Sequence, residues 1–126
     1  MQGSCLCGDV TFVISGKPMD VGYCHCGQCR KQSGHYWASA TIPVSQIEIA
    51  GAVRWFASSD FAKRGFCPHC GSFLFWKHND EDALGFSLGA VDGRTGLHPV
   101  KHIFVADKGD YYDIADGLPQ EEAEIS

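Results

Sequence analysis

The sequence predicts a mostly β protein built as a single domain. Fifteen glycines and five prolines divide the chain into short segments rich in β-branched and aromatic residues, which is typical of strands joined by turns. No window shows a sustained apolar repeat of helical period. The chain has 126 residues, of which 44% are hydrophobic, and this is enough for one domain with its own core.

The predicted strands follow one another along the chain, and each ends at a glycine, a proline or a polar run. The segment VTFVIS ends at Gly16, for example, and YWASATI ends at Pro43. A turn or two of helix is predicted at residues 28–32. The acidic tail after Pro119 is expected to fray. The full set of predicted strands is 10–15, 21–23, 36–42, 47–49, 53–57, 73–77, 84–88 and 102–105.

All seven cysteines fall into three tight groups with the spacings C-x-C, C-x-C-x-x-C and C-x-x-C. Such spacings bring thiolates together as tetrahedral zinc requires. Disulfides fit poorly, because seven is odd and a bridge across a single intervening residue would be strained. The sequence therefore predicts metal ligation. The three groups, each at a predicted strand end or turn, are Cys5/Cys7, Cys24/Cys26/Cys29 and Cys67/Cys70.

The cysteines divide into one closed zinc site and one open site. The central group supplies three sulfurs and can fill a site alone, whereas each outer pair needs the other. Structural zinc takes four protein ligands, and catalytic zinc keeps one position open. The predicted structural ligands are Cys5, Cys7, Cys67 and Cys70, and the predicted catalytic ligands are Cys24, Cys26 and Cys29. The alternative is two structural sites, with the second completed by His25, His35 or His69.

Charge and hydropathy narrow the possible functions. A net charge of −5 argues against a general nucleic-acid binder, whose affinity rests on phosphate neutralisation. No stretch approaches the roughly 20 apolar residues of a membrane span, and the N-terminus MQGSCLCG lacks the pattern of a signal peptide. Clustered free thiols persist in a reducing compartment. We therefore expect a soluble, cytoplasmic protein that does not bind membranes.

Four segments carry a resemblance to a known family: GSCLCGDVTF (3–12), YCHCGQCRKQSG (23–34), KRGFCPHCGSFLFW (63–76) and HIFVADKGDYYDIADGLP (102–119). Together they resemble the glutathione-dependent formaldehyde-activating enzyme family, which includes centromere protein V-like proteins. The resemblance implies a single zinc-binding domain over residues 1–126, with several short coiled antiparallel sheets around zinc-binding knuckles. It also implies the same division of the cysteines between a structural and an active-site zinc.

The resemblance implies a chemistry as well. Glutathione would be the cosubstrate of a carbon-sulfur lyase, similar to S-hydroxymethylglutathione synthase, that acts on an adduct of formaldehyde or a small aldehyde. The chain departs from the family pattern at Asp110 and Tyr111, where a Pro-Trp pair is common, and at Glu121, where an aromatic residue is usual. These departures bear on the identity of the substrate rather than on zinc binding.

Basic residues flank the cysteine groups and are candidates for ligand binding. Arg30 and Lys31 directly follow the third ligand, where they could pair with the two carboxylates of glutathione or offset the charge of the thiolates. Lys63 and Arg64 are weaker candidates for the same roles. His35 is a candidate proton shuttle, because histidine titrates near neutrality. The ordinary interpretation of all five is a solvated surface.

Three functions from different classes remain in competition. The first is a zinc-dependent carbon-sulfur lyase that uses glutathione or a related thiol, and it rests on the three-ligand site. The second is a carrier that binds glutathione or another small thiol without accelerating any reaction. The third is an interaction module in which both zinc ions are structural. Turnover above the uncatalysed rate separates the first function from the other two.

Overall fold

The computed structural model describes residues 1–124, while residues 125 and 126 of the acidic tail lie outside the described part. Its strands form two sheets, of three and seven strands. The small sheet is antiparallel, in the order β1 (Gln2–Ser4), β2 (Thr11–Ile14) and β5 (Ile47–Ala50). The large sheet has the order β10-β3-β4-β9-β8-β7-β6. Its members are β3 (Met19–Cys24), β4 (Trp37–Pro43), β6 (Arg54–Ala57), β7 (Ala62–Phe66), β8 (Phe73–His78), β9 (Ala83–Ser87) and β10 (His102–Ile103).

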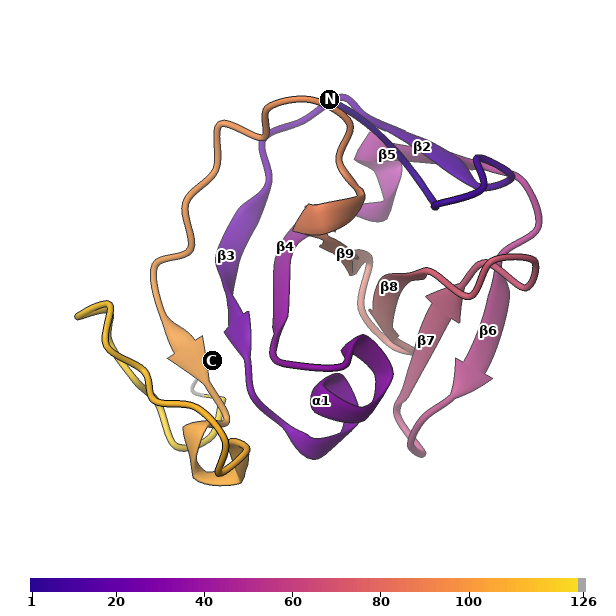
Figure 1. Ribbon diagram of the computed structural model, residues 1–126. Helices are drawn as coiled ribbons and strands as arrows, with labels where there is room; N and C mark the ends of the chain where they lie inside the picture. Colours follow the sequence, from indigo (N-terminus) through magenta and orange to yellow (C-terminus); the bar gives the residue numbers. More distant parts are fainter. Residues whose placement is uncertain (125–126) are drawn as a thin grey trace.

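The large sheet curls so that β3 and β4 lie on one side of the α-helix α1 (Gly27–Ser33), and β7 and β6 lie on the other (Figure 1). Strand twist of constant hand produces such curling. Neighbouring strands are antiparallel, except that β10 runs parallel to β3 at the edge of the sheet. The C-terminal part of the chain is thereby brought beside the loop that follows β3. Three 3-10 turns complete the structure: η1 (Val44–Gln46), η2 (Leu88–Ala90) and η3 (Val105–Asp107).

The predicted mostly β, single-domain fold is confirmed, with two strands added and one shortened. The strands β1 and β7 were not predicted from the sequence. The sequence of β7, AKRGF, combines two cations with a glycine and lacks the β-branched residues that mark a strand. It is a strand because its backbone pairs with β6 on one side and β8 on the other. The strand predicted at 102–105 is shorter, because Phe104 adopts the left-handed conformation with φ of 56°.

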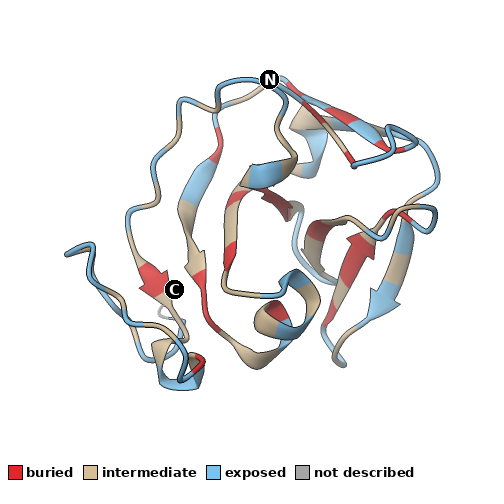
Figure 2. Ribbon diagram, viewed as in Figure 1, coloured by how far each residue is buried: buried red, intermediate tan, exposed pale blue. Residues whose placement is uncertain are grey.

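The main core lies between the two sheets and is centred on three phenylalanines. Phe12 of β2 packs edge-on against Phe75 of β8, with ring centroids 5.4 Å apart, and contacts Phe86 of β9 at 6.0 Å. Gly3 of β1 admits this packing, since a Cβ there would lie 2.1 Å from the Phe12 ring. Figure 2 shows the buried segments on the facing strands of both sheets. Burial of aromatic surface is the main force that joins the small sheet to the large one.

The helix α1 is short, and its ends are set by specific residues. Cys26 caps its start, because the sulfur accepts a hydrogen bond from the amide of Cys29 at 3.3 Å. Gly34 ends it in the left-handed conformation, with φ of 86°, and donates its amide proton to the carbonyl of Arg30. The helix predicted at residues 28–32 is therefore confirmed. No helix within residues 1–124 is long and apolar enough to cross a membrane.

The tail that was expected to fray is held in place over residues 120–122. The amide of Glu121 donates to the carbonyl of His102 at 2.9 Å, and the amide of Val105 donates to the carbonyl of Glu121 at 3.0 Å. The Glu121 carboxylate also lies 3.5 Å from the Lys101 ammonium. Composition suggested disorder here, but backbone pairing with the open edge of β10 orders the segment.

Candidate metal centres

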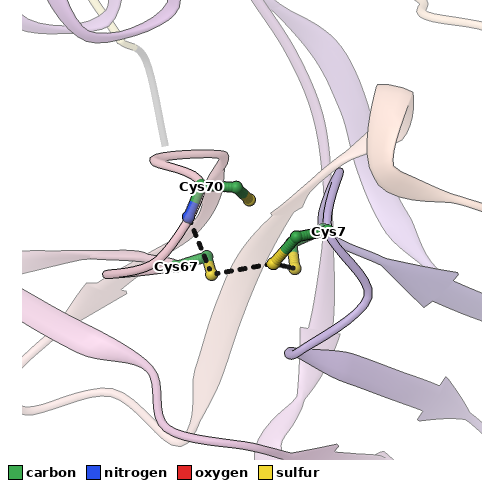
Figure 3. Close-up of side chains that lie close together, drawn as sticks. Cys7, Cys67 and Cys70 are labelled. Atoms are coloured by element: carbon green, nitrogen blue, oxygen red, sulfur yellow. Dashed lines mark hydrogen bonds between the residues drawn. The ribbon is translucent and has the colours of Figure 1, made fainter.

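The outer cysteine pairs come together as one group, as the sequence predicted. Cys5 and Cys7 lie in the turn after β1, and Cys67 and Cys70 lie in the turn between β7 and β8. The sulfur of Cys7 lies 3.6 Å from that of Cys5 and 3.8 Å from that of Cys67. Figure 3 shows Cys7 and Cys67 facing each other across the gap between the two turns. Tetrahedral zinc with Zn–S bonds of about 2.3 Å requires sulfurs about 3.8 Å apart, so this donor set fits zinc.

The backbone around the four-cysteine group is shaped as a metal knuckle. The amide of Cys70 donates to the sulfur of Cys67 at 3.4 Å, and the amide of Gly71 donates to the Cys67 carbonyl at 2.8 Å. Gly71 has φ of 79°, a conformation that glycine adopts without strain. On the other turn, the amide of Val10 donates to the sulfur of Cys5 at 3.3 Å. Amide protons that point at sulfur favour the thiolate form that binds metal.

The central cysteines form a second group at the junction of β3 and α1. Cys24 ends β3, Cys26 caps α1, and Cys29 lies one turn into the helix. Their sulfurs all lie within 4.8 Å of one another, and no histidine, aspartate or glutamate in residues 1–124 joins them. The three sulfurs fit zinc by number and by type, with no fourth protein ligand in the described chain.

The three histidines considered as a fourth ligand of this group bond to other side chains. Both ring nitrogens of His25 bond to other side chains, and His35 pairs with Tyr111, its Nδ1 lying 2.8 Å from the tyrosine hydroxyl. His69 lies beside the other cysteine group, where its Nδ1 is 2.7 Å from a carboxylate oxygen of Asp9. Within residues 1–124, the geometry therefore favours an open three-cysteine site over a second closed site.

The three central sulfurs do not ionise equally. Hydrogen bonding to Cys24 and to Cys29 lowers the pKa of Cys26, and nearby Arg64 acts in the same direction. The contacts with Cys26 and Cys29, together with burial, raise the pKa of Cys24. At Cys29 the contact with Cys24 lowers the pKa, but the contact with Cys26 and burial outweigh it and raise the pKa to about 11. Without metal, Cys26 is therefore the cysteine of this group that ionises most readily.

This unequal ionisation predicts how metal binding depends on pH. Zinc binds thiolates, so Cys24 and Cys29 must each lose a proton, and we expect about two protons to be released at neutral pH. The pKa values of both groups are raised, so protons compete with the metal throughout the neutral range and zinc affinity increases as the pH rises. Calorimetry in buffers of different ionisation enthalpy measures this release, after the exchangeable metal has been removed. A release of three protons would show that no resting thiolate exists.

Arg64 is the cation that the structure places at the three-cysteine group. Arg64 is 4% exposed, and the two terminal nitrogens of its guanidinium lie 3.5 and 3.6 Å from the sulfur of Cys29. One terminal nitrogen also donates to the side-chain oxygen of Gln32 at 3.4 Å, and the guanidinium lies over the ring of Phe73. From the sequence, Arg64 was a weaker candidate than Arg30 and Lys31. Its contact with Cys29 arises from the curl of the large sheet, which brings β7 beside α1.

Arg30 and Lys31 project to different places, although they are adjacent in the chain. Lys31 lines a cleft of about 410 Å³ that we call the cationic cleft; Arg30 does not line it. The Nε atom of Arg30 is buried with no hydrogen-bond partner in residues 1–124. Successive helical residues point about 100° apart, which accounts for the divergence. The cationic cleft is lined by Gln28, Lys31, Gln32, Phe56, Ser58 and Arg64.

Apolar residues from three elements cover the three-cysteine group. Trp37 is 8% exposed and packs against the cysteines together with Phe73, Ile103 and Phe104. Phe104 has φ of 56°, a backbone conformation that costs a non-glycine residue about 1–2 kcal/mol. Such strain is concentrated at functional sites. A groove of about 760 Å³ also reaches this region, where Gln32, Trp37 and Phe73 are among the residues that line it.

Three comparisons with known proteins found similar proteins. A family model described as glutathione-dependent formaldehyde-activating enzyme matches residues 1–107. A Schizosaccharomyces pombe protein named an uncharacterized lyase is 27% identical over 124 residues, which covers 90% of this chain and 85% of the yeast protein. A crystal structure of a Rhodobacter sphaeroides protein has a similar fold, with a TM-score of 0.61 at 24% identity over 76% of this chain and 92% of that one. Because the family model matches well over half of this chain, the chain belongs to the glutathione-dependent formaldehyde-activating enzyme family.

Proposed function

We propose that this protein is a zinc-dependent carbon-sulfur lyase that joins glutathione, or a related thiol, to formaldehyde or another small aldehyde, and reverses that reaction. The observation that carries the proposal is a group of three cysteines with no fourth protein ligand in residues 1–124, within a chain of this family. Cys5, Cys7, Cys67 and Cys70 would hold a structural zinc, and the whole of residues 1–126 would form one domain. Clustered free thiols support a reducing compartment such as the cytoplasm.

The reaction balances without an oxidant or reductant. The thiol sulfur forms a bond to the carbonyl carbon, and the thiol proton ends on the oxygen of the new hydroxymethyl group. A zinc ion held by Cys24, Cys26 and Cys29 would supply an open coordination position that favours the thiolate form of an incoming thiol. Arg64 would offset the negative charge of the cysteine sulfurs, since its guanidinium lies against Cys29. The aromatic cover would keep water from one side of the group.

The cationic cleft would bind the charged part of the thiol. It is lined by Lys31, by Arg64, which is 4% exposed, and by Phe56, which is 60% exposed. A ligand with carboxylates and a short peptide backbone matches this mixture of cations, amides and apolar surface. Because Arg64 also contacts Cys29, the cleft adjoins the three-cysteine group. Glutathione in the cleft would therefore carry its sulfur near the proposed zinc.

Removal of the cleft's exposed cation tests this recognition. We expect Lys31→Ala to weaken the binding of glutathione about ten- to a hundredfold, because a charge-assisted hydrogen bond is worth about 1.5 to 3 kcal/mol. Binding of β-mercaptoethanol, which has no carboxylate, should change by less than about twofold by the same measure. Arg30→Ala is the matched variant, since Arg30 is the adjacent cation outside the cleft. Titration calorimetry of wild type and the two variants with both thiols gives six affinities. Equal losses for the two thiols in Lys31→Ala would exclude carboxylate recognition by Lys31.

Turnover decides between a lyase and a carrier. The uncatalysed addition of a thiol to formaldehyde is already rapid, so the rate must be measured as magnetisation exchange at equilibrium with and without protein. A lyase raises the exchange rate in proportion to protein concentration. A carrier binds glutathione and leaves the exchange rate unchanged. An interaction module neither binds glutathione nor changes the exchange rate.

A further inference from the structure

Two buried histidines meet directly behind the three-cysteine group. His25 lies between Cys24 and Cys26 in the chain and has no exposed surface, and His102 on β10 is 2% exposed. The Nε2 atom of His25 and the Nδ1 atom of His102 are 2.8 Å apart. The backbone amide of His25 also donates to the carbonyl of Ile103 at 3.0 Å. The loop that carries two of the three cysteines is thus joined to the C-terminal segment by side chain and by backbone.

The histidine pair is the middle of a longer chain of hydrogen bonds. At one end, the hydroxyl of Tyr112 lies 2.5 Å from Nδ1 of His25. At the other end, a carboxylate oxygen of Asp116 lies 2.8 Å from Nε2 of His102. The second oxygen of Asp116 accepts the amide proton of Leu118 at 3.0 Å. All four ring nitrogens of the histidine pair therefore have a partner.

The ionised Asp116 carboxylate sets the direction of the first hydrogen bond in this network, and a single proton on each histidine sets the direction of the others. An ionised carboxylate only accepts, so His102 donates its Nε2 proton to Asp116. With a single proton, on Nε2, His102 presents Nδ1 as an acceptor, and His25 donates its own Nε2 proton to it. Nδ1 of His25 is left as an acceptor for the hydroxyl proton of Tyr112. Both histidines are thus held in the same tautomer, protonated at Nε2.

The orientation of His25 is coupled to the direction of the cysteine sulfurs. Cys24 ends a strand, and Cys26 has an extended backbone with φ of −63° and ψ of 158°. In extended chain, successive side chains point to opposite sides. The ring of His25 therefore points away from the side on which the sulfurs of Cys24 and Cys26 gather. A rotation of the backbone that moved either sulfur would pull the His25 ring out of its two hydrogen bonds.

We propose that His102, Tyr112 and Asp116 are positioning residues that lock His25 and thereby hold the sulfurs of Cys24 and Cys26 in place for a metal. This inference rests on the metal role proposed above for the three-cysteine group. The three positioning residues come from the C-terminal segment, more than 70 positions from the cysteines that they orient. Partners behind a metal ligand typically change metal affinity ten- to a hundredfold when they are removed.

The variant Tyr112→Phe tests the proposal with the least disturbance, because it removes one hydroxyl and keeps the ring that stacks on His25 at 5.5 Å. The matched control is Tyr111→Phe, the same change at the next residue, whose hydroxyl bonds to His35. Each protein is loaded with zinc, and the release of metal to a mild chelator is followed without any substrate. We expect the faster-released zinc to leave about ten times faster from Tyr112→Phe than from wild type. The release rate of the slower zinc should be unchanged, and Tyr111→Phe should match wild type.

Nitrogen-15 NMR of the histidine rings in the wild-type protein measures directly which ring nitrogens of His25 and His102 carry a proton. We expect neutral Nε2-protonated tautomers for both His25 and His102, and loss of the fixed tautomer at His25 in Tyr112→Phe. A proton on Nδ1 of either ring, or equal zinc release from the two tyrosine variants, overturns the inference. If the tautomers are as expected but the wild-type protein takes up only one zinc per chain, the metal role of the three cysteines fails, and the positioning role fails with it. If zinc is released readily but the tautomers differ, the proposed function stands, and only the positioning role of His102, Tyr112 and Asp116 is rejected.

Discussion

Replacing Cys67 by serine is expected to unfold the protein, whereas replacing Cys26 by serine should leave it folded. The two residues have equivalent local roles, since each sulfur accepts the amide proton of the cysteine three positions later. They differ in what their group joins. The four-cysteine group ties the turn after β1 to the turn between β7 and β8, and so fastens the small sheet to the large one. The three-cysteine group lies within residues 24–29.

The expected size of the difference follows from the energetics of structural zinc. Such a zinc contributes roughly 10 to 16 kcal/mol of apparent binding free energy, against a typical domain stability of about 5 to 15 kcal/mol. Cys67→Ser and Cys5→Ser should therefore be insoluble or lose near-ultraviolet circular dichroism. Cys29→Ser is the control matched for burial, because Cys29 is 2% exposed and Cys67 is fully buried. Equal destabilisation by Cys67→Ser and Cys29→Ser would show that the division into a structural and a functional site is wrong.

The second large effect is expected at the open site. One zinc per chain should pass readily to a mild chelator, because a three-cysteine site leaves the metal accessible on one side, and the second zinc should be retained. Glutathione should change the release rate of the first zinc only. The variants Cys24→Ser, Cys26→Ser and Cys29→Ser should each abolish this effect and reduce the glutathione-dependent exchange of formaldehyde to the uncatalysed rate.

Metal analysis during chelation, followed by the exchange measurement, checks both parts of this expectation. The variant Cys7→Ser is unsuitable as a control, since it belongs to the group that holds the sheets together. Val44→Ala serves instead, because it alters an exposed residue outside both clusters that contain the cysteines. If both zinc ions resist the chelator equally and glutathione changes neither, the site is closed. The protein would then be better described as an interaction module.

The sequence was most informative where the relevant residues are neighbours in the chain. The C-x-C-x-x-C spacing predicted the three-cysteine group, because six consecutive residues that pass from a strand into a helix can gather three sulfurs without help from elsewhere. The pairing of Cys5 and Cys7 with Cys67 and Cys70 was also predicted, because each pair lacks enough ligands alone. Strands rich in aromatic and β-branched residues were found as well. The strand β7 was missed, since its sequence AKRGF carries no such signal.

What the sequence by itself determined is therefore the grouping of the cysteines, the mostly β fold and the family. The tertiary structure decided which distant side chains surround the ligands. The curl of the large sheet carries Arg64 against Cys29, and the parallel pairing of β10 with β3 brings His102 against His25. Neither contact could be predicted from composition or spacing, because each joins residues at least 35 positions apart through backbone pairing that many sequences share. The helix likewise separates Arg30 from Lys31, since the direction of a side chain depends on the backbone that carries it.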